Sequence, residues 1–266
     1  MTMILKRLGN KKKVAKEIQK HFPPHKIYIE PFFGAGGMFF NKPKAKYNIV
    51  NDLDSDVFNL FQVVMNQKDE LEKAFYMMPF HSDLLEYWKK NKEVDTIKKA
   101  LRFLFLSNFT YLGNGGILRF GGSRFTSKNN YLNLINKTFD LLFDVQFNNK
   151  DFKVLFNSIS LDDRSLRKGE SSKTFIYNDP PYQNTDDNYS HSFTKQDLID
   201  LIEVNIETGC KFAISEFDNP VVLELADQYN LEVITIGQRQ NLKNRRTEIL
   251  IVNYQSPGKY GLFAGH

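Results

Sequence analysis

The chain has 266 residues, of which 41% are hydrophobic and 25% are charged, as in an ordinary globular protein. This length suits one sizeable α/β domain with an insertion, or two modest domains. No stretch approaches the roughly 18 consecutive apolar residues that span a membrane, and the basic N-terminal segment has no long apolar core behind it. The single Cys210 excludes a disulfide or a cysteine-based metal site within one chain. We therefore expect a cytoplasmic protein without a secretory signal.

The net charge of +5 is modest, but the basic residues form three clusters along the chain. These clusters are Lys6, Arg7, Lys11, Lys12, Lys13, Lys16 and Lys20; Lys89, Lys90, Lys92, Lys98, Lys99 and Arg102; and Arg239, Lys243, Arg245 and Arg246. Each cluster alone is typical of a solvated face, whereas three in one basic chain favour a polyanionic partner.

The first predicted element is a short helix over residues 10–21, which follows Gly9 and ends before two prolines. A glycine just before a helix lets backbone N–H groups approach a ligand, and the Lys11 side chain suits a carboxylate or a phosphate. Read alone, the same residues are a capped helix with a basic surface.

A predicted strand over residues 27–33 runs into a turn that contains Gly34, Gly36 and Gly37. This arrangement is typical of nucleotide-binding proteins, because glycines allow a tight turn and a close approach of backbone to ligand. The spacing lacks the third glycine of the dinucleotide fingerprint, which disfavours a nucleotide-dependent oxidoreductase.

The next predicted strand, over residues 47–51, ends at Asp52, which lies 18 positions after Gly34 (52 − 34). This is close to the ~20-residue offset at which an acid reaches a ribose hydroxyl. The alternative is that Asp52 caps the helix that follows. Both roles can hold, since Asp54 is the better cap.

Residues 68–108 carry apolar side chains at helical spacing with lysines between them, and they interrupt the alternation of strands and helices. We therefore expect an inserted helical subdomain. Residues 111–125 follow as predicted glycine-rich loops around a short strand, with Arg119 and Arg124 among aromatic residues. Flexible backbone, guanidinium groups and rings suit a loop that enters a DNA groove, while the apolar residues of this segment argue against a disordered linker.

Strands and helices alternate again in the C-terminal half. The expected elements are strands over residues 143–147, 175–177, 211–215, 232–236 and 248–252 and helices over residues 195–206 and 219–228. The basic segment between the last two strands is expected to form a hairpin-like excursion, in which Arg245 and Arg246 suit phosphate groups.

The strand over residues 175–177 leads into Asp179, Pro180, Pro181 and Tyr182. Two prolines cannot continue a ladder of hydrogen bonds, so the acid and the ring are expected at the carboxyl end of the strand, where open α/β sheets bind ligands. An acceptor, free carbonyls and a ring suit a flat base that carries an amino group. For the tetrapeptide alone, a simple turn with a solvated acid and a packed tyrosine is the better interpretation.

Taken together, the motifs resemble the Dam-type group of S-adenosylmethionine-dependent adenine-N6 DNA methyltransferases, with the motif order of the alpha group. The matching segments are Leu8-Gly-Asn-Lys11, Glu30-Pro-Phe-x-Gly34-Ala-Gly36, Asn51-Asp52, Asp179-Pro-Pro-Tyr182, Ser192-Phe-Thr194 and Thr247-Glu-Ile-Leu. The resemblance runs roughly from Leu8 to Tyr254. It implies a class I methyltransferase fold, which is a Rossmann-like α/β fold with a mostly parallel sheet and an antiparallel terminal strand. The catalytic domain would comprise residues 1–66 and 139–256, and residues 67–138 would form an inserted, mainly helical DNA-recognition subdomain with a short hairpin.

The resemblance also implies roles for individual residues. The cofactor S-adenosylmethionine would be bound by Gly9, Asn10, Lys11, Phe32, Gly34, Ala35, Gly36, Asp52, Phe152 and Asp179. Catalysis would fall to Asp179, Pro180, Pro181 and Tyr182. The DNA contacts would be made by Lys11, Arg119, Arg124, Lys243, Arg245 and Arg246. Asp52 would bind the ribose hydroxyls and Phe152 the adenine ring of the cofactor, and no metal is required.

The chemistry that the resemblance implies takes place at an adenine flipped out of double-stranded DNA. The Asp179 carboxylate and the Pro180 carbonyl would accept both amino hydrogens, so that the nitrogen lone pair can attack the methyl group of the cofactor. Tyr182 would stack on the base, a contact worth roughly 1 to 3 kcal/mol, against a flipping cost of a few kcal/mol.

The sequence departs from the family pattern in two places. Arg7 stands where the family has an aromatic residue, and the recognition hairpin matches in Ile117 and Arg119 but has only residues 120–124 in place of the usual second part. The hairpin is therefore expected to be short or rearranged, and a GATC target is not assumed. An RNA or protein-glutamine N-methyltransferase is the alternative function, although such enzymes usually carry Asn before the prolines and lack so long an insertion. We expect a monomer that acts on duplex DNA, with or without a cognate restriction endonuclease.

Overall fold

The structure is a computed structural model that describes residues 3–5, 10–111, 116–118, 124–159, 170–182, 193–240 and 245–259. For residues 124–127, 239, 240, 245 and 259 it describes the backbone alone.

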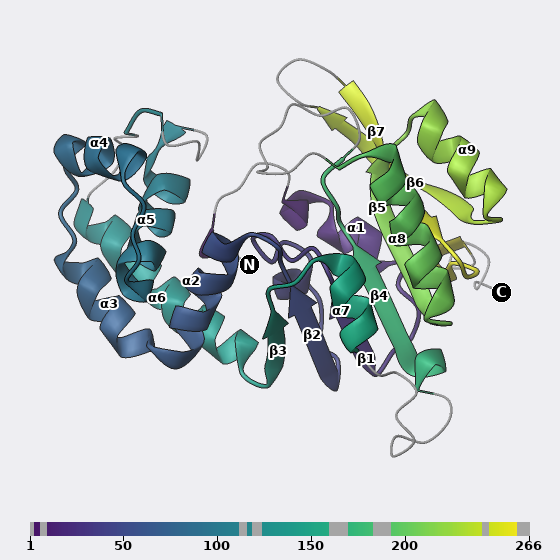
Figure 1. Ribbon diagram of the computed structural model, residues 1–266, viewed down its shortest axis with the longest axis horizontal. Helices are drawn as coiled ribbons and strands as arrows, with labels where there is room; N and C mark the ends of the chain where they lie inside the picture. The colour runs from purple at the N-terminus through teal and green to yellow at the C-terminus, as the bar shows by residue number, and fades with distance from the viewer. Residues whose placement is uncertain are drawn as a thin grey trace, which may run out of the picture.

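A seven-stranded sheet with the order β3-β2-β1-β4-β5-β7-β6 forms the centre of the molecule (Figure 1). The strands are β1 Ile27–Glu30, β2 Tyr47–Asn51, β3 Val145–Asn148, β4 Thr174–Asn178, β5 Lys211–Phe217, β6 Glu232–Gln240 and β7 Arg245–Val252. The first five run parallel, while β7 lies antiparallel to both β5 and β6. The expected mostly parallel sheet with an antiparallel terminal strand is therefore confirmed.

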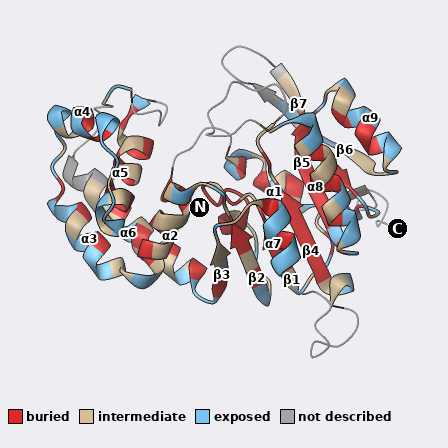
Figure 2. Ribbon diagram, in the orientation of Figure 1, coloured by how far each residue is buried: buried red, intermediate tan, exposed pale blue. Residues whose placement is uncertain are grey.

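Both faces of the sheet are covered by helices, which is why the central strands read as continuous apolar runs. Ile29 of β1 and Ile176 of β4 pack with α7 Phe152–Ser158, α8 Lys195–Glu207 and α9 Pro220–Gln228. Their neighbours Tyr28 and Phe175 point to the other face and pack with α1 Ala15–Gln19 and α2 Ser55–Asn66. All five residues of β4 are buried (Figure 2).

The other helices lie beside the sheet, on the side of β3 (Figure 1). They are α3 Lys68–Met77, α4 Ser82–Lys90, α5 Thr96–Phe109 and α6 Arg124–Leu142. The first three confirm the helices expected within residues 68–108. None of the described helices is long and apolar enough to cross a membrane.

Helix α6 corrects one expectation of the sequence analysis. Arg124 was expected in a glycine-rich loop, yet it is the first residue of a 19-residue helix. Asparagine, which has a weak helix propensity, recurs along this segment and weakens its helical pattern. Buried Tyr131 and Ile135 supply the apolar contacts of α6, which packs against α3. The proposed domain boundary between residues 138 and 139 falls inside α6.

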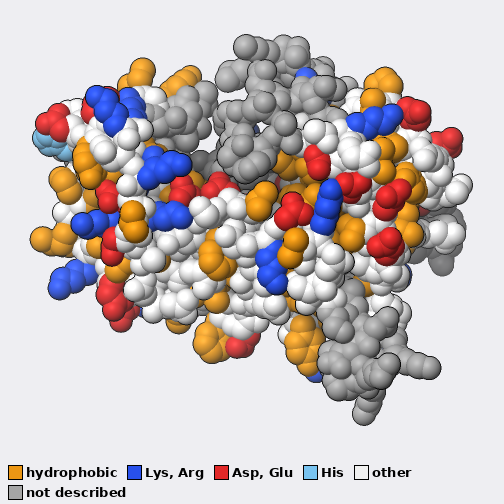
Figure 3. Space-filling view, in the orientation of Figure 1, with side chains coloured by type: hydrophobic (Ala, Val, Ile, Leu, Met, Phe, Trp, Pro, Cys, Tyr) orange, Lys and Arg blue, Asp and Glu red, His pale blue; other side chains and the backbone are white. Residues whose placement is uncertain are grey.

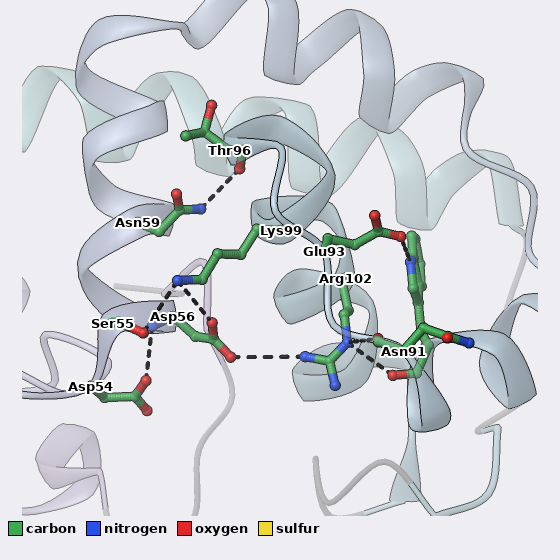
Figure 4. Close-up of polar contacts among 10 residues, drawn as sticks. Asp54, Ser55, Asp56, Asn59, Asn91, Glu93, Thr96, Lys99 and Arg102 are labelled. Carbon is green, nitrogen blue, oxygen red and sulfur yellow. Dashed lines mark hydrogen bonds and ion pairs between the residues drawn. The ribbon is translucent and has the colours of Figure 1, made fainter.

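Ion pairs and hydrogen bonds join α2 to α5 (Figure 4). The Asp56 carboxylate of α2 lies 3.4 Å from Lys99 Nζ and 3.8 Å from an Arg102 guanidinium nitrogen of α5. Arg102 Nε also donates hydrogen bonds to the carbonyls of Trp88 and Asn91. Part of the middle basic cluster therefore pairs within the protein, with only 24% and 15% of the Lys99 and Arg102 side chains exposed.

Candidate active site

The predicted motifs meet where the parallel strands β1, β2 and β4 end. Pairing of β1 with both β2 and β4 brings the segments after Glu30, Asn51 and Asn178 to one edge of the sheet. Two of these segments are the glycine-rich turn and the Asp-Pro-Pro-Tyr turn, so motifs about 145 residues apart (179 − 34) become neighbours. This is the arrangement that the sequence predicted.

The glycine-rich turn after β1 requires its glycines. Gly34 and Gly36 have φ angles of +54° and +71°, which side chains other than hydrogen disfavour. A Cβ atom on Gly36 would lie 2.3 Å from the Phe40 ring, and one on Gly37 would lie 2.8 Å from the backbone nitrogen of Lys11. Gly37 thus allows the N-terminal segment with Lys11 to pack against the turn.

Asp52 holds this turn in place. One carboxylate oxygen accepts a hydrogen bond of 2.5 Å from the Gly34 N–H, and the other accepts one of 2.9 Å from Asp54 N–H at the start of α2. Asp54 itself caps α2 through Asp56 N–H, as the sequence suggested. Asp52 therefore lies beside the glycine-rich turn, at the position predicted for a ribose-binding acid.

Asn51 is a supporting residue to which the sequence analysis gave no role. Its amide nitrogen donates to the carbonyls of Pro31 and Lys150, and its amide oxygen accepts from Lys150 N–H. These three bonds tie together the ends of β1, β2 and β3. The match to the Asn51-Asp52 motif was the one signal that pointed to this residue.

Three aromatic rings form an apolar wall next to the turn. The ring centroid of Phe32 lies 5.7 Å from that of Phe152 and 6.0 Å from that of Phe193, and the last two are 6.3 Å apart. The structure therefore brings the predicted cofactor residues Phe32 and Phe152 together. Phe193 belongs to the Ser192-Phe-Thr194 segment, for which the sequence predicts no separate role of the ring.

Lys11 links the N-terminal segment to the Asp-Pro-Pro-Tyr turn. Its ammonium nitrogen lies 2.6 Å from Asp179 Oδ1 and 3.1 Å from Glu248 Oε1, and it donates a hydrogen bond to the hydroxyl of Tyr182. Lys11 and Glu248 are 2% and 1% exposed, whereas Asp179 is 20% exposed. A buried ammonium group is strongly unfavourable without such partners, so the two carboxylates account for its burial.

Tyr182 is fixed at both ends. Its hydroxyl donates a hydrogen bond of 2.5 Å to Glu248 Oε1, and its ring meets the Phe217 ring edge-on at a centroid distance of 4.6 Å. Burial, together with the carboxylates of Asp179 and Glu248, raises the pKa of Tyr182 well above its ordinary value of 10.0. The hydroxyl therefore stays protonated and remains a donor. The sequence analysis assigned no role to Glu248.

A second buried glutamate lies behind this site. Glu30 accepts a hydrogen bond of 2.7 Å from the Tyr28 hydroxyl, and burial raises the pKa of Glu30 to about 8. Burial likewise lowers the pKa of Lys42 to about 8, although the nearby Glu30 opposes this shift. At neutral pH Glu30 is mostly neutral, so it adds little negative charge behind Asp179.

Some predicted site residues lie outside the described part of the chain. Gly9, Arg119 and Lys243 are not described, and only the backbone of Arg124 and Arg245 is described. The guanidinium carbon of Arg246 lies 5.4 Å from the centroid of the Phe217 ring, which also contacts Tyr182. Within the described ranges, no group of three or more His, Cys, Asp or Glu side chains is arranged to hold a metal ion.

Comparison with known proteins agrees with this geometry. Residues 8–243 match the family model of the D12 class N6 adenine-specific DNA methyltransferases. The chain belongs to this family. It is therefore an adenine-specific DNA methyltransferase, which acts on N6 of adenine in DNA.

Three relatives are similar to this chain over most of their length. The chain is 26% identical to the DNA adenine methylase of Escherichia coli K12 over 249 residues, covering 87% of this chain and 86% of the relative. It is 25% identical to the type II methyltransferase M.MjaIII of Methanocaldococcus jannaschii, covering 94% and 98%. It is 24% identical to the type II methyltransferase M1.LlaDCHI of Lactococcus lactis subsp. cremoris, covering 92% and 93%.

Proposed function

We propose that this D12 methyltransferase transfers the methyl group of S-adenosylmethionine to N6 of an adenine flipped out of double-stranded DNA. The observation that carries the proposal is the position of the Asp-Pro-Pro-Tyr turn after β4, next to the glycine-rich turn after β1. A base-binding turn beside a nucleotide-binding turn suits a reaction between a nucleobase and a nucleoside cofactor.

The residues at the end of β1 fit S-adenosylmethionine. Gly34 has open space where a side chain would lie, and the rings of Phe32 and Phe152 offer an apolar surface for an adenine ring. Asp52 lies against the turn through the hydrogen bond from Gly34 N–H, and a carboxylate after the second strand of such a fold suits ribose hydroxyls. When bound, S-adenosylmethionine supplies an electrophilic methyl group.

Asp179 and Pro180 would orient the amino group of the adenine. The lone pair of that nitrogen is delocalised into the ring, which makes it a poor nucleophile. Two acceptors, the Asp179 carboxylate and the Pro180 carbonyl, can take both amino hydrogens and favour the tetrahedral geometry that localises the lone pair. Asp179 is the more exposed member of its ion pair with Lys11, so it is the member that a base can reach.

Tyr182 and the basic residues would hold the DNA. The Tyr182 ring would stack on the flipped base, while Arg119, Arg124, Lys243, Arg245 and Arg246 would contact the duplex. Residues 67–138 would form the target-recognition subdomain. Relatives bear the names of DNA adenine methylases and of type II methyltransferases, which supports both a solitary role and one beside a restriction endonuclease. A monomer in the cytoplasm remains the expectation from the sequence.

Methyl transfer from labelled S-adenosylmethionine tests the proposal. Unmethylated duplex DNA, RNA and protein are offered to the wild-type enzyme and to Asp179→Ala. We expect label in the duplex alone, recovered as N6-methyladenine, and a rate at least about 100-fold lower in Asp179→Ala, as for other preorganised polar groups at reacting centres. DNA labelling that survives Asp179→Ala would refute the role of the acid, and label in RNA or protein would favour the alternative substrate class.

The same preparation gives the target sequence. Sequencing that detects methylated adenines in DNA from cells that express the protein shows which sites are modified. A shared motif around them defines the duplexes needed for the kinetic experiments below.

A further inference from the structure

Glu248 enters the site from an unexpected direction. It lies on β7, opposite Phe217 of β5, whereas Asp52, Asp179 and Tyr182 follow the carboxyl ends of parallel strands. Its side chain is 1% exposed. A buried carboxylate is unfavourable unless it is paired, and this one has two partners in the site, the Tyr182 hydroxyl and the Lys11 ammonium group.

We propose that Glu248 is a positioning residue for methyl transfer, which fixes the ring of Tyr182 and shares the Lys11 ammonium group with Asp179, so that Lys11 binds Asp179 less tightly. The inference rests on the proposed roles of Asp179 and Tyr182. Glu248 itself touches neither the base nor the cofactor in this scheme.

The first part of the role concerns the plane of the Tyr182 ring. A stacking ring is most effective when its plane is set before the base arrives, since ordering it later lowers the gain in binding. The Phe217 ring holds one edge of Tyr182, and Glu248 holds the hydroxyl at the opposite end. Because the acceptor is charged, this hydrogen bond is stronger than one between neutral groups.

The second part concerns the sharing of one ammonium group between two carboxylates. Lys11 Nζ lies closer to Asp179 Oδ1, at 2.6 Å, than to Glu248 Oε1, at 3.1 Å. The amino hydrogens of an adenine must compete with this ammonium for the Asp179 oxygens. With Glu248 neutral, Lys11 would bind Asp179 alone and more tightly, and the competition would be harder. The negative charge of Glu248 therefore keeps Asp179 available.

Two substitutions test these parts, one that affects both of them and one that affects the hydrogen bond of Tyr182. Glu248→Gln keeps the shape and an acceptor oxygen for Tyr182 but removes the charge, while Tyr182→Phe keeps the ring but removes the hydroxyl. Glu224→Gln serves as the matched control, because Glu224 lies on α9 with 69% of its side chain exposed. Each variant is assayed for single-turnover methylation of a duplex with the mapped target, for S-adenosylmethionine affinity and for thermal unfolding.

We expect Glu248→Gln and Tyr182→Phe each to lower the single-turnover rate about 10-fold or more, with unchanged cofactor affinity and a control equal to wild type. Since both residues belong to one network, the double variant should lose less than the product of the two single losses. A role in stability alone predicts a lower unfolding temperature with a normal rate for the folded enzyme. That result, or losses that multiply, would overturn the inference.

The activity of Asp179→Ala distinguishes a failure of the proposed function from a failure of the proposed role of Glu248. If Asp179→Ala is inactive and Glu248→Gln reacts at the wild-type rate, the role of Glu248 fails while the proposed function stands. If Asp179→Ala retains activity, the proposed function fails first. If Glu248→Gln does not fold, Tyr182→Phe provides the test. A wild-type rate in Tyr182→Phe would show that the hydrogen bond between Tyr182 and Glu248 does not contribute to methyl transfer, which would overturn the inference.

Discussion

Two buried glutamates, Glu248 and Glu30, lie next to the site, and they have different hydrogen-bond and ion-pair partners. Glu248 faces the ammonium group of Lys11, whereas Glu30 faces the hydroxyl of Tyr28. A hydroxyl offers less compensation for a buried charge than an ammonium group does, so burial keeps Glu30 protonated up to about pH 8. The two residues cannot be told apart by residue type, only by what surrounds them.

The raised pKa of Glu30 predicts a pH-dependent stability. Between pH 4.5 and about 8 the folded protein holds a proton that the unfolded chain has released, so this carboxyl group favours the folded state less as the pH rises. Glu30→Gln stays neutral throughout. The free energy of unfolding of Glu30→Gln should therefore rise relative to wild type by about 1 kcal/mol per pH unit within this window.

Urea unfolding of both proteins at pH 5.5, 6.5 and 7.5 measures this difference. Only the points at pH 5.5 and 6.5 lie below the range in which Lys42 changes its charge, because the pKa of Lys42 is lowered to about 8, so the slope is taken from these two points. Other titrating groups cancel, since they are common to both proteins. A difference that is constant with pH would show that Glu30 titrates normally.

At the scale of elements, two constraints act on the glycines of the glycine-rich turn: the positive φ angle and the space around the Cβ position. Gly34 and Gly36 both have positive φ angles, but a Cβ atom would find open space at Gly34 and the Phe40 and Phe33 rings at Gly36. Gly34→Ala should lower the free energy of unfolding by about 1 to 2 kcal/mol through backbone strain. Gly36→Ala should lower it by about 1 to 3 kcal/mol more, because the rings must also move.

A third glycine provides the control for this comparison. Gly209 has a φ of +63° and open space around its Cβ position, but it lies in the turn between α8 and β5. Gly209→Ala should match Gly34→Ala in urea unfolding while leaving S-adenosylmethionine affinity unchanged. Equal losses at Gly34 and Gly36 would mean that the turn adjusts to the added methyl group.

The elements that the sequence predicted well are those whose local pattern agrees with their burial. The strands and the turns that follow them are local features, because apolar runs, glycines and prolines act on their own neighbours. Helix α6 was not predicted, because part of its burial comes from α3 in another part of the chain, where the Phe75 ring packs against Tyr131.

The same distinction explains which site residues were predicted. Asp52 and Asp179 follow strands directly, so strand order alone brings them together. Glu248 reads as one polar residue in an apolar strand, and its place beside Lys11 arises only when β7 pairs with β5. Both residues lie in segments that match the family, but neither segment indicates that they contact each other across 237 positions (248 − 11).

At the scale of the whole molecule, the basic residues are less available than their number suggests. On the face of the molecule that Figure 3 shows, Lys and Arg side chains lie over the helices beside β3, with acidic side chains among them. Lys99 and Arg102 pair with Asp56, and Lys11 lies in the site. We therefore expect DNA affinity to depend on a small number of cations.

Arg246 offers a test of this view. If it contacts a phosphate, Arg246→Ala should weaken binding to all duplexes alike and reduce the slope of log K against log salt by about 0.9. Fluorescence anisotropy with a labelled duplex between 50 and 200 mM salt, roughly the range over which such slopes are measured, gives both quantities. Arg239 has no described side chain, so Lys211 at the amino end of β5 is the better control for a lost charge, and Lys211→Ala should leave the slope unchanged.

The strand order of the sheet also fixes the sequence of events during synthesis. Among the described strands, β6 joins the sheet only through β7, although β6 is made first. On the ribosome, β6 must therefore wait until β7 emerges, and the two can then close the sheet against β5 together. Lys11 and Asp179 are both present long before that moment, but Glu248 arrives with the last strand. The ion-pair network around the Asp-Pro-Pro-Tyr turn is thus completed only after β7 has been made.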